Sequence, residues 1–362
     1  MRNRLSGGSP TDARERAARA QARRKPTLAD VAQRAGVSTS TASRALNGHT
    51  GLAPATRAAV VDAAARLNFH PSALARSLRT QQTHTVGFVV PDVASPFYAA
   101  ALKGAQGRLE QAGYRVMLMD ANQDVERELA ALETLLSHQV DGLLVATAGM
   151  PRPTFDDAVS PHPTPAIFFD GVIDGAGEGT VTLDNAGGIA LLVEHLAEHG
   201  HRRIAFLAGS LRESAGAERL AAFRAAAAAR GVEPPERHVK LCEWDIAAAR
   251  LASTELLDDP DRPSAVIASS AELALGFLAA AAAARAAIPD DVALVSFDDP
   301  YFGRLLDPPL TAIGYDPSEI GASAAGLLVD AMRSGDGSQR HVRVPVTLVR
   351  RRSCGCVMDE DA

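Results

Sequence analysis

The sequence predicts a small all-α headpiece followed by an α/β body of two doubly wound lobes. Three observations support this fold class: helically spaced apolar residues in the first part, strands alternating with helices in the rest, and a division of charge between them. Residues 1–80 hold 14 Lys and Arg against 4 Asp and Glu, whereas the other residues of the 362-residue chain hold 23 against 39. A basic head on an acidic body indicates a polyanion-binding module joined to a domain with another task.

Composition narrows the class of protein. No run approaches the ~20 consecutive apolar residues that a transmembrane helix needs, so no membrane partner is expected. The N-terminal arginines are not followed by the apolar segment of a signal peptide. The three cysteines, Cys242, Cys354 and Cys356, do not suggest a disulfide framework. We therefore expect a cytoplasmic protein.

Residues 1–25 are polar, with Gly-Ser-Pro near the start and arginines later, and predict a disordered basic arm. The arm either adds nonspecific attraction to phosphates or is a solvated tail without a specific role. The second interpretation is the simpler one.

Residues 26–70 predict three short helices. The first buries a face of residues spaced i, i+3, i+4 and i+7, namely Leu28, Val31, Ala32 and Ala35. A tight break at Gly36 follows, and Ser38 can cap the second helix, whose polar stripe faces outward. The third begins at Pro54 and buries Val60, Ala63, Ala64 and Leu67. Two helices joined by a short glycine turn, the second with its polar face outward, form a helix-turn-helix.

Several stretches carry a family resemblance. In the headpiece they are TLADVAQRAGVSTSTASRALNG and HPSALARSLRT, and in the body DNAGGIALLVEHLAEHGHRRIAFLAG, DDVALVSFDDP and PPLTAI. From Pro26 to Arg352 the chain resembles the lactose-repressor/galactose-repressor (LacI/GalR) family of bacterial transcription regulators. The resemblance implies a periplasmic-binding-protein-like body, pseudo-palindromic operator DNA as a partner, and a homodimer that is not an enzyme.

The second helix of the headpiece is expected to enter the major groove of DNA. The predicted headpiece contacts are Thr27, Ser38, Thr39, Ser40, Arg44 and Asn47. Thr39 and Ser40 lie near the N-terminus of this helix, where they can meet base edges, and Arg44 can reach a guanine or a phosphate. Thr27 and Asn47 suit phosphate contacts, which position a protein without reading sequence.

Residues 71–82 are predicted to form a hinge helix and linker. Pro71–Thr80 has a helical composition, but helices shorter than about 12–15 residues are marginal in water. By resemblance, this segment orders on DNA, with Ala75 and Arg76 at the minor groove and Leu78 wedged between central base pairs. The alternative is an ordinary linker helix packed on the body.

From Thr83 onward, predicted strands and helices alternate. Strands are expected at 86–90, 116–119, 142–146, 166–169, 181–183, 204–207, 265–269 and 292–297, with a final extended segment at 342–349. Helices are expected at 97–111, 125–138, 186–199, 215–230, 271–286 and 317–333, and a Pro-rich loop at 151–165. This alternation implies parallel sheets covered on both faces, with ligands beyond the carboxyl ends of the strands.

The predicted body spans residues 83–353 and a tail follows at 354–362. Its N-lobe is expected at about 83–183 and 315–343, and its C-lobe at about 184–314 and 344–353. Tetramers of the resembled family use an additional leucine-rich C-terminal helix, whereas here only SCGCVMDEDA follows Arg352. A dimer is therefore expected.

Five body residues match effector contacts of the resembled family, namely Phe97, Asp170, Arg219, Trp244 and Asp298, and Ser270 is expected as a sixth contact although it departs from the family pattern. Carboxylates accept hydroxyl protons, a guanidinium donates a planar fork, and aromatic faces stack on a ring. The set therefore suits a sugar or a related polyol or nucleoside-like ligand. Each residue also has a structural interpretation: Asp170 and Asp298 as helix caps, Arg219 as a surface charge, and Trp244 as part of the core.

Ser270-Ala271 stands where the resembled family commonly has an Asn-Asp pair. Both the amide and the carboxylate are missing, and a serine hydroxyl makes one shorter contact. We therefore expect an effector that is larger than a simple hexose or carries different functional groups.

Two further motifs are assigned no function. His195 to His199 spells H-x-x-E-H, whose two histidines can bind zinc one helical turn apart. The motif lies at a helix end, where histidines favour the helix dipole, and zinc catalysis is not expected. Cys354-Gly-Cys356 lacks partner ligands at zinc spacing and is interpreted as incidental. We therefore expect no metal and no cofactor.

The sequence thus predicts a sequence-specific transcription regulator, by resemblance a repressor, associated with the nucleoid. A small metabolite between the two lobes would control it by a population shift. One alternative is a DNA-binding protein whose body is a vestigial scaffold that senses nothing. A hydrolase or a transporter-associated sugar-binding protein is a third class, which the basic headpiece disfavours.

Overall fold

The computed structural model describes residues 26–47, 51–69, 82–232, 234–334 and 339–356. The chain divides into two compact units, residues 1–83 and 84–362, which contain the headpiece and the body. The predicted arm at 1–25 and the predicted hinge contacts Ala75, Arg76 and Leu78 lie outside the described residues.

The described headpiece consists of helices α2 (Leu28–Ala35), α3 (Thr39–Leu46) and α4 (Pro54–Arg66). The predicted inward faces meet in one small core around the buried residues Val31, Ala42 and Val60, which confirms the helix-turn-helix. The turn at Gly36 has φ +67°, a left-handed conformation that glycine adopts without strain. Ala53 leaves α4 without a side-chain cap, which costs about 1 kcal/mol relative to serine or threonine.

The body contains two six-stranded sheets, both within the described residues. The first has the order β11-β5-β4-β3-β1-β2 and is parallel throughout. Its strands are β1 (Thr85–Val90), β2 (Arg115–Asp120), β3 (Gly142–Val145), β4 (Ala166–Phe169), β5 (Gly179–Leu183) and β11 (Arg340–Val344). Helices α6 (Pro96–Gln111), α7 (Val125–Ser137), α8 (Arg152–Val159) and α13 (Pro317–Ser334) complete this N-lobe.

The second sheet has the order β12-β10-β9-β8-β6-β7, in which only the β10–β12 pair is antiparallel. Its strands are β6 (Ile204–Ala208), β7 (Val239–Leu241), β8 (Ala265–Ala268), β9 (Ala293–Ser296), β10 (Thr311–Gly314) and β12 (Thr347–Val349). Helices α9 (Asn185–Glu198), α10 (Ser214–Ala229), α11 (Ile246–Asp258) and α12 (Ala271–Ala284) complete this C-lobe, with a 3₁₀ turn at Arg352–Cys354. The chain passes between the sheets after β5, β10 and β11, so neither lobe is one continuous segment.

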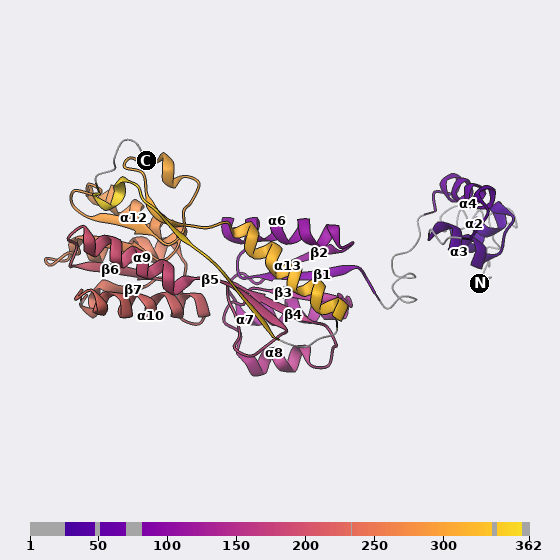
Figure 1. Cartoon of the computed structure of the whole chain (residues 1–362), viewed down its shortest axis with the longest axis horizontal. Coiled ribbons are helices and arrows are strands. Elements are labelled where there is room, and N and C mark those ends of the chain that lie inside the picture. Colours follow the sequence, from indigo (N-terminus) through magenta and orange to yellow (C-terminus); the bar gives the residue numbers. More distant parts are fainter. Residues whose placement is uncertain (1–25, 48–50, 70–81, 233, 335–338, 357–362) are drawn as a thin grey trace, which may run out of the picture. The chain divides into compact units, whose positions relative to one another are not determined.

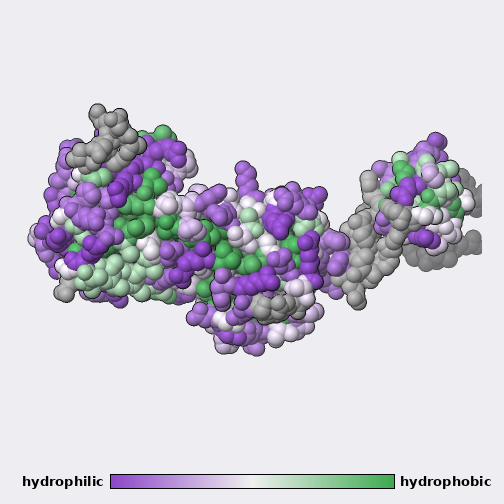
Figure 2. Space-filling model, viewed as in Figure 1, coloured by the Kyte–Doolittle hydropathy of each residue, from purple (hydrophilic) through white to green (hydrophobic). Residues whose placement is uncertain are grey.

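Helices cover both faces of each sheet because successive strand residues point to opposite sides. In β1, Val86 and Phe88 pack into the core under α6 and α13, whereas Val89 packs into the core under α7 and α8. Figure 1 shows α6 and α13 together on one side of the N-lobe and α7 and α8 on the other. In the view of Figure 2 the surface of the body is mostly hydrophilic, with apolar patches on both lobes.

The structure corrects the sequence prediction at several places. The segment predicted as a Pro-rich loop contains α8, whose Phe155 is buried, and the prediction omitted β7, α11 and β10. The final extended segment is two strands in different sheets, since β11 pairs with β5 and β12 with β10. Among the described helices, none combines the length and apolar character needed to cross a membrane.

Candidate functional site

The headpiece presents an exposed polar face. Ser38 caps α3 by accepting a hydrogen bond from the Thr41 amide, at 3.2 Å, as the sequence predicted. Thr39, Ser40 and Arg44 lie on the same helix outside the core, while Ala42 and Ala45 are buried behind them. The residues predicted to read bases are therefore free of the headpiece core.

Thr27 and Asn47, the predicted phosphate contacts, also stabilise helix ends. Thr27 and Asp30 form a reciprocal capping box at the start of α2. Asn47 ends α3, and its side-chain amide donates to the Ser43 carbonyl at 2.7 Å. Both residues are exposed, so these caps leave them accessible to a phosphate.

One pocket in the body contains all six predicted effector residues. It has a volume of about 590 Å³ including its mouth and is lined by Pro91, Asp92, Ser95, Phe97, Tyr98, Gln123, Asp170, Glu213, Ala215, Arg219, Trp244, Ser270, Glu272, Asp298 and Tyr315. Most of these residues follow the carboxyl ends of β1, β2, β4, β6, β7, β8, β9 and β10, where parallel sheets bind ligands. Their role in binding an effector stays a prediction.

The two predicted aspartates are each held by a tyrosine that the sequence prediction omitted. The Tyr98 hydroxyl donates to Asp170 Oδ2 at 2.8 Å, and the Tyr315 hydroxyl donates to Asp298 Oδ1 at 2.5 Å. Asp298 also accepts from the Ala271 amide at 2.8 Å, so it caps α12 as well as lining the pocket. The cap and the ligand-facing interpretations of Asp298 are thus compatible.

Arg219 is buried, not a surface charge. Its Nε donates to Asn185 Oδ1 at 2.8 Å, and one terminal nitrogen donates to the Ser269 carbonyl at 2.6 Å. The guanidinium carbon lies 3.7 Å from the centroid of the Phe297 ring, which is a cation–π contact. Arg219 is among the residues predicted from the sequence to line the site. Its partners Asn185 and Phe297 are not evident from the sequence, because the fold brings them to it.

Trp244 lies beside Arg219, whose guanidinium carbon is 5.7 Å from the centroid of the Trp244 ring, and the indole N–H donates to Glu213 Oε1 at 2.9 Å. A Cβ atom at Gly209 would collide with the indole ring, so only glycine lets the ring lie against that backbone. Glu243 and Trp244 both have left-handed backbone conformations, with φ of +49° and +57°. Consecutive left-handed non-glycine residues store strain, a feature that concentrates at ligand sites.

The pocket is rich in carboxyl groups beyond the two predicted. Glu213 is buried, and desolvation, reinforced by the nearby Asp170 charge, raises its pKa to about 8. Desolvation likewise raises the pKa of Asp170, opposed by the charge of Arg219. A ligand rich in hydroxyl donors would find acceptors on several walls.

Ser270 caps α12 by accepting from the Leu273 amide at 3.3 Å. The carboxylate missing at Ala271 is replaced one residue later, because Glu272 lines the pocket and accepts from the Ser95 hydroxyl at 3.2 Å. That hydrogen bond joins α12 of the C-lobe to the start of α6 in the N-lobe. The pocket therefore retains an acidic group at this wall.

Comparison with known proteins decides the family. The model of "Bacterial regulatory proteins, lacI family" matches residues 27–72, and that of "Periplasmic binding protein-like domain" matches residues 193–354. The ribose operon repressor of Escherichia coli K12 is 32% identical over 331 residues, covering 90% of this chain and 99% of the relative. The chain belongs to the LacI family. Its relative PurR, also from E. coli, is 31% identical over 329 residues, with 90% of this chain and 96% of PurR covered.

Solved structures of LacI-family proteins share the fold. The lac repressor dimer bound to operator and an anti-inducer superposes with a TM-score of 0.81 at 26% identity, covering 91% of this chain and 99% of that one. The complex of the transcriptional regulator CelR with cellobiose gives a TM-score of 0.67 at 32% identity, with the same coverage. Membership of the LacI family makes this chain a DNA-binding transcription repressor and not an enzyme.

Cys354-Gly-Cys356 lacks partner ligands at zinc spacing along the sequence, but the fold places possible partners beside it. Ligand atoms of His195, His199 and Cys356 all lie within 4.8 Å of one another. No sequence spacing joins the two motifs, because 154 residues lie between His199 and Cys354. The fold brings them together when the C-terminal segment returns to the end of α9.

Proposed function

We propose that this LacI-family chain is a homodimeric, sequence-specific repressor whose operator affinity is set by a sugar-like effector bound between the two lobes. The proposed domains are the headpiece at 26–70, the hinge at 71–82 and the body at 83–353. The observation that carries the proposal is the pocket in which all six predicted residues meet. The proposed place of action is the nucleoid in the cytoplasm.

The pocket supports control by lobe movement because both lobes contribute to it. Asp170 and Phe97 come from the N-lobe, and Arg219, Trp244 and Asp298 from the C-lobe. Two hydrogen bonds join the lobes near the pocket: Ser95 to Glu272 at 3.2 Å and the Val172 amide to the Ser214 hydroxyl at 3.0 Å. A ligand with contacts on both lobes would bind more tightly at one angle between the lobes than at another. This difference in affinity is what a population shift requires.

The proposed effector is a hydroxyl-rich ligand larger than one hexose, such as a disaccharide. Asp170, Asp298 and Glu272 supply hydroxyl acceptors, and Phe97 and Trp244 supply apolar faces against which sugar rings pack. CelR, which is 32% identical to this chain, is described in complex with cellobiose. Ser270 lines the pocket with a side chain shorter than the asparagine common in the family.

A homodimer is supported by apolar surface on the C-lobe. Leu241 on β7, Ile246 and Leu251 on α11, and Leu275 on α12 are 55%, 41%, 67% and 41% exposed. α11 and α12 pack against each other, so these side chains lie on neighbouring elements. The similar lac repressor structure is a dimer on operator DNA.

Operator binding in the presence of sugars tests the proposal. An operator found by genome-wide binding-site mapping would be titrated with the full chain, alone and with saturating cellobiose or ribose. Cellobiose should change the operator Kd by about 5–150-fold, the usual range of allosteric coupling, and ribose should change it little. Micromolar binding of ribose or another plain monosaccharide would contradict the larger effector, and no response to a broad sugar panel would favour the scaffold alternative.

Leu78 provides a separate test of the predicted hinge. Leu78→Ala should weaken binding to the specific operator far more than to random DNA, because an apolar wedge acts only on a kinked specific site. Both affinities would be measured by fluorescence anisotropy at one salt concentration. Arg79→Ala is the matched control, since removing a basic side chain should weaken both complexes similarly. Equal losses for Leu78→Ala on the two DNAs would reject the wedge.

A further inference from the structure

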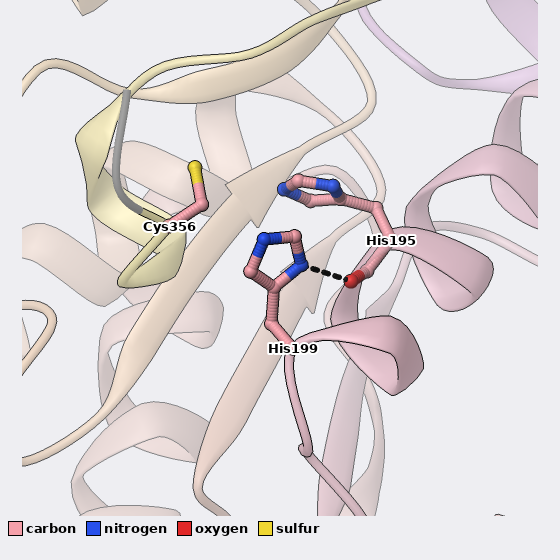
Figure 3. A group of neighbouring side chains, drawn as sticks. All are labelled: His195, His199 and Cys356. Carbon is pink, nitrogen blue, oxygen red and sulfur yellow. Dashed lines mark hydrogen bonds between the residues drawn. The ribbon is translucent and has the colours of Figure 1, made fainter. Parts of the chain in front are cut away.

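Two histidines and two cysteines meet at the edge of the C-lobe, outside the effector pocket. His195 Nε2 lies 3.2 Å from Cys354 Sγ, and Cys354 Sγ lies 2.7 Å from Cys356 Sγ. Ligand atoms of His195, His199 and Cys356 lie within 4.8 Å of one another. Figure 3 shows both imidazole rings and the Cys356 thiol pointing into the same space.

The local fold explains why these side chains converge. His195 and His199 are four residues apart at the end of α9, so both rings project from one face of the helix. Cys354 ends the 3₁₀ turn, and Gly355 follows with φ +76°, a left-handed conformation that favours glycine. This turn places the sulfurs of Cys354 and Cys356 beside each other, facing α9.

His199 is in a state suited to binding a metal ion. The Nδ1 of His199 lies 2.7 Å from the His195 carbonyl oxygen, which can only accept, so Nδ1 carries the proton. The Nε2 of a neutral His199 therefore has a free lone pair. A hydrogen bond from the other ring nitrogen to a carbonyl is the usual way in which proteins orient a metal-binding histidine.

The cysteines are also held by hydrogen bonds. The Thr311 hydroxyl donates to Cys354 Sγ at 3.3 Å, and the Cys356 thiol lies 3.0 Å from the Arg351 carbonyl oxygen. Zn²⁺ binding at these sulfurs would release the protons that the thiols carry.

We propose that His195, His199, Cys354 and Cys356 bind one Zn²⁺ ion in a closed, structural site. Two nitrogens and two sulfurs are a donor set that zinc prefers, and four protein ligands leave no open position for catalysis. Tetrahedral coordination with Zn–S of ~2.3 Å and Zn–N of ~2.0 Å needs ligand atoms roughly 3.3–3.8 Å apart. The two sulfurs, 2.7 Å apart, are closer than this range, so zinc binding requires the cysteine side chains to rotate apart and the exposed His199 ring to turn towards them.

The ion would tie the C-terminal segment to α9. Ser353, next to Cys354, donates to the Leu294 carbonyl at 2.6 Å and accepts from the Thr311 amide at 2.8 Å, so the segment already lies on β9 and β10. The other end of α9 carries Asn185, the hydrogen-bond partner of Arg219 in the pocket. Zinc would therefore stabilise the helix that supports the pocket floor.

Zinc content and cobalt spectroscopy of the full chain test the site. The protein, purified under reducing conditions, is stripped with a chelator and titrated with Zn²⁺ against a chromophoric competitor. We expect one zinc per chain, a higher Tm on zinc addition, and with Co²⁺ both tetrahedral d–d bands and thiolate-to-cobalt charge transfer. These measurements do not depend on operator binding or on the effector. Their outcome therefore tests the zinc site separately from the proposed function.

Variants separate this site from adventitious binding. His199→Ala removes an exposed ligand without disturbing the core, and together with Cys356→Ser it should abolish stoichiometric zinc and the charge-transfer band. Cys242→Ala and His138→Ala are matched controls, a buried cysteine and a histidine elsewhere in the body, and should bind zinc as the parent does. Absence of zinc binding in the folded, reduced parent, a Cys354–Cys356 disulfide in that protein, or unchanged binding by His199→Ala would overturn the proposal.

Discussion

Arg219→Lys is expected to raise the effector concentration that half-saturates the response by about 100-fold. Hydrogen bonds to a charged group contribute about 1.5–3 kcal/mol each, and the substitution removes the geometry for them. Arg219 donates to Asn185 and to the Ser269 carbonyl while its guanidinium lies on the Phe297 ring. A lysine keeps the charge but has no planar fork and stacks poorly. The measurement is the cellobiose concentration that half-saturates the change in operator affinity.

The control for Arg219→Lys lies on the same helix. Arg224 is exposed on α10 and pairs with Glu236 at 2.7 Å, so Arg224→Lys keeps an equivalent surface charge. It should leave the cellobiose response unchanged. Thermal unfolding of both variants checks that the body remains folded, and operator affinity without sugar checks the headpiece. An Arg219→Lys protein that is folded and responds like the parent would remove this residue from the effector site.

Glu213→Gln is expected to stabilise the ligand-free body at alkaline pH. The pKa of Glu213 is about 8 in the folded chain, raised from an ordinary 4.5 by desolvation and by the Asp170 charge. A raised pKa means that the folded state binds the proton more tightly, so this contribution to stability is complete below about pH 4.5 and is lost as pH rises through about 8. Each tenfold difference in proton affinity between the folded and unfolded states corresponds to about 1.4 kcal/mol, so the variant should gain a few kcal/mol at high pH.

Urea unfolding of the parent and of Glu213→Gln at a series of pH values measures this effect. The free energies of unfolding of the two proteins should nearly coincide at about pH 4.5. They should diverge towards pH 8, with the variant the more stable protein. The free energy of unfolding of the variant should still depend on pH, because burial also raises the pKa of Glu128 to about 7. Glu133→Gln, an exposed position on α7, should track the parent at every pH. A variant that instead loses stability relative to the parent as pH rises above about 4.5 would show that ionised Glu213 stabilises the folded state.

The headpiece could be predicted from the sequence almost completely. Its helices are short, and their caps and buried faces depend on residues within a few positions of one another, as with Thr27 and Asp30. The errors in the body have a physical cause as well. The Pro-rich segment was predicted as a loop, but a proline is compatible with the first turn of a helix, and α8 begins there with Phe155 directed into the core.

The sequence by itself determined the family, the charge division and the identity of six pocket residues, because motifs and local spacing carry that information. Only the tertiary structure decided which groups those residues meet: Tyr98 on Asp170, Tyr315 on Asp298, and Asn185 and Phe297 around Arg219. It also decided that His195 and His199 face Cys354 and Cys356. These partners are far apart along the chain, and parallel strands with returning segments place them together, so no local pattern contains the contact.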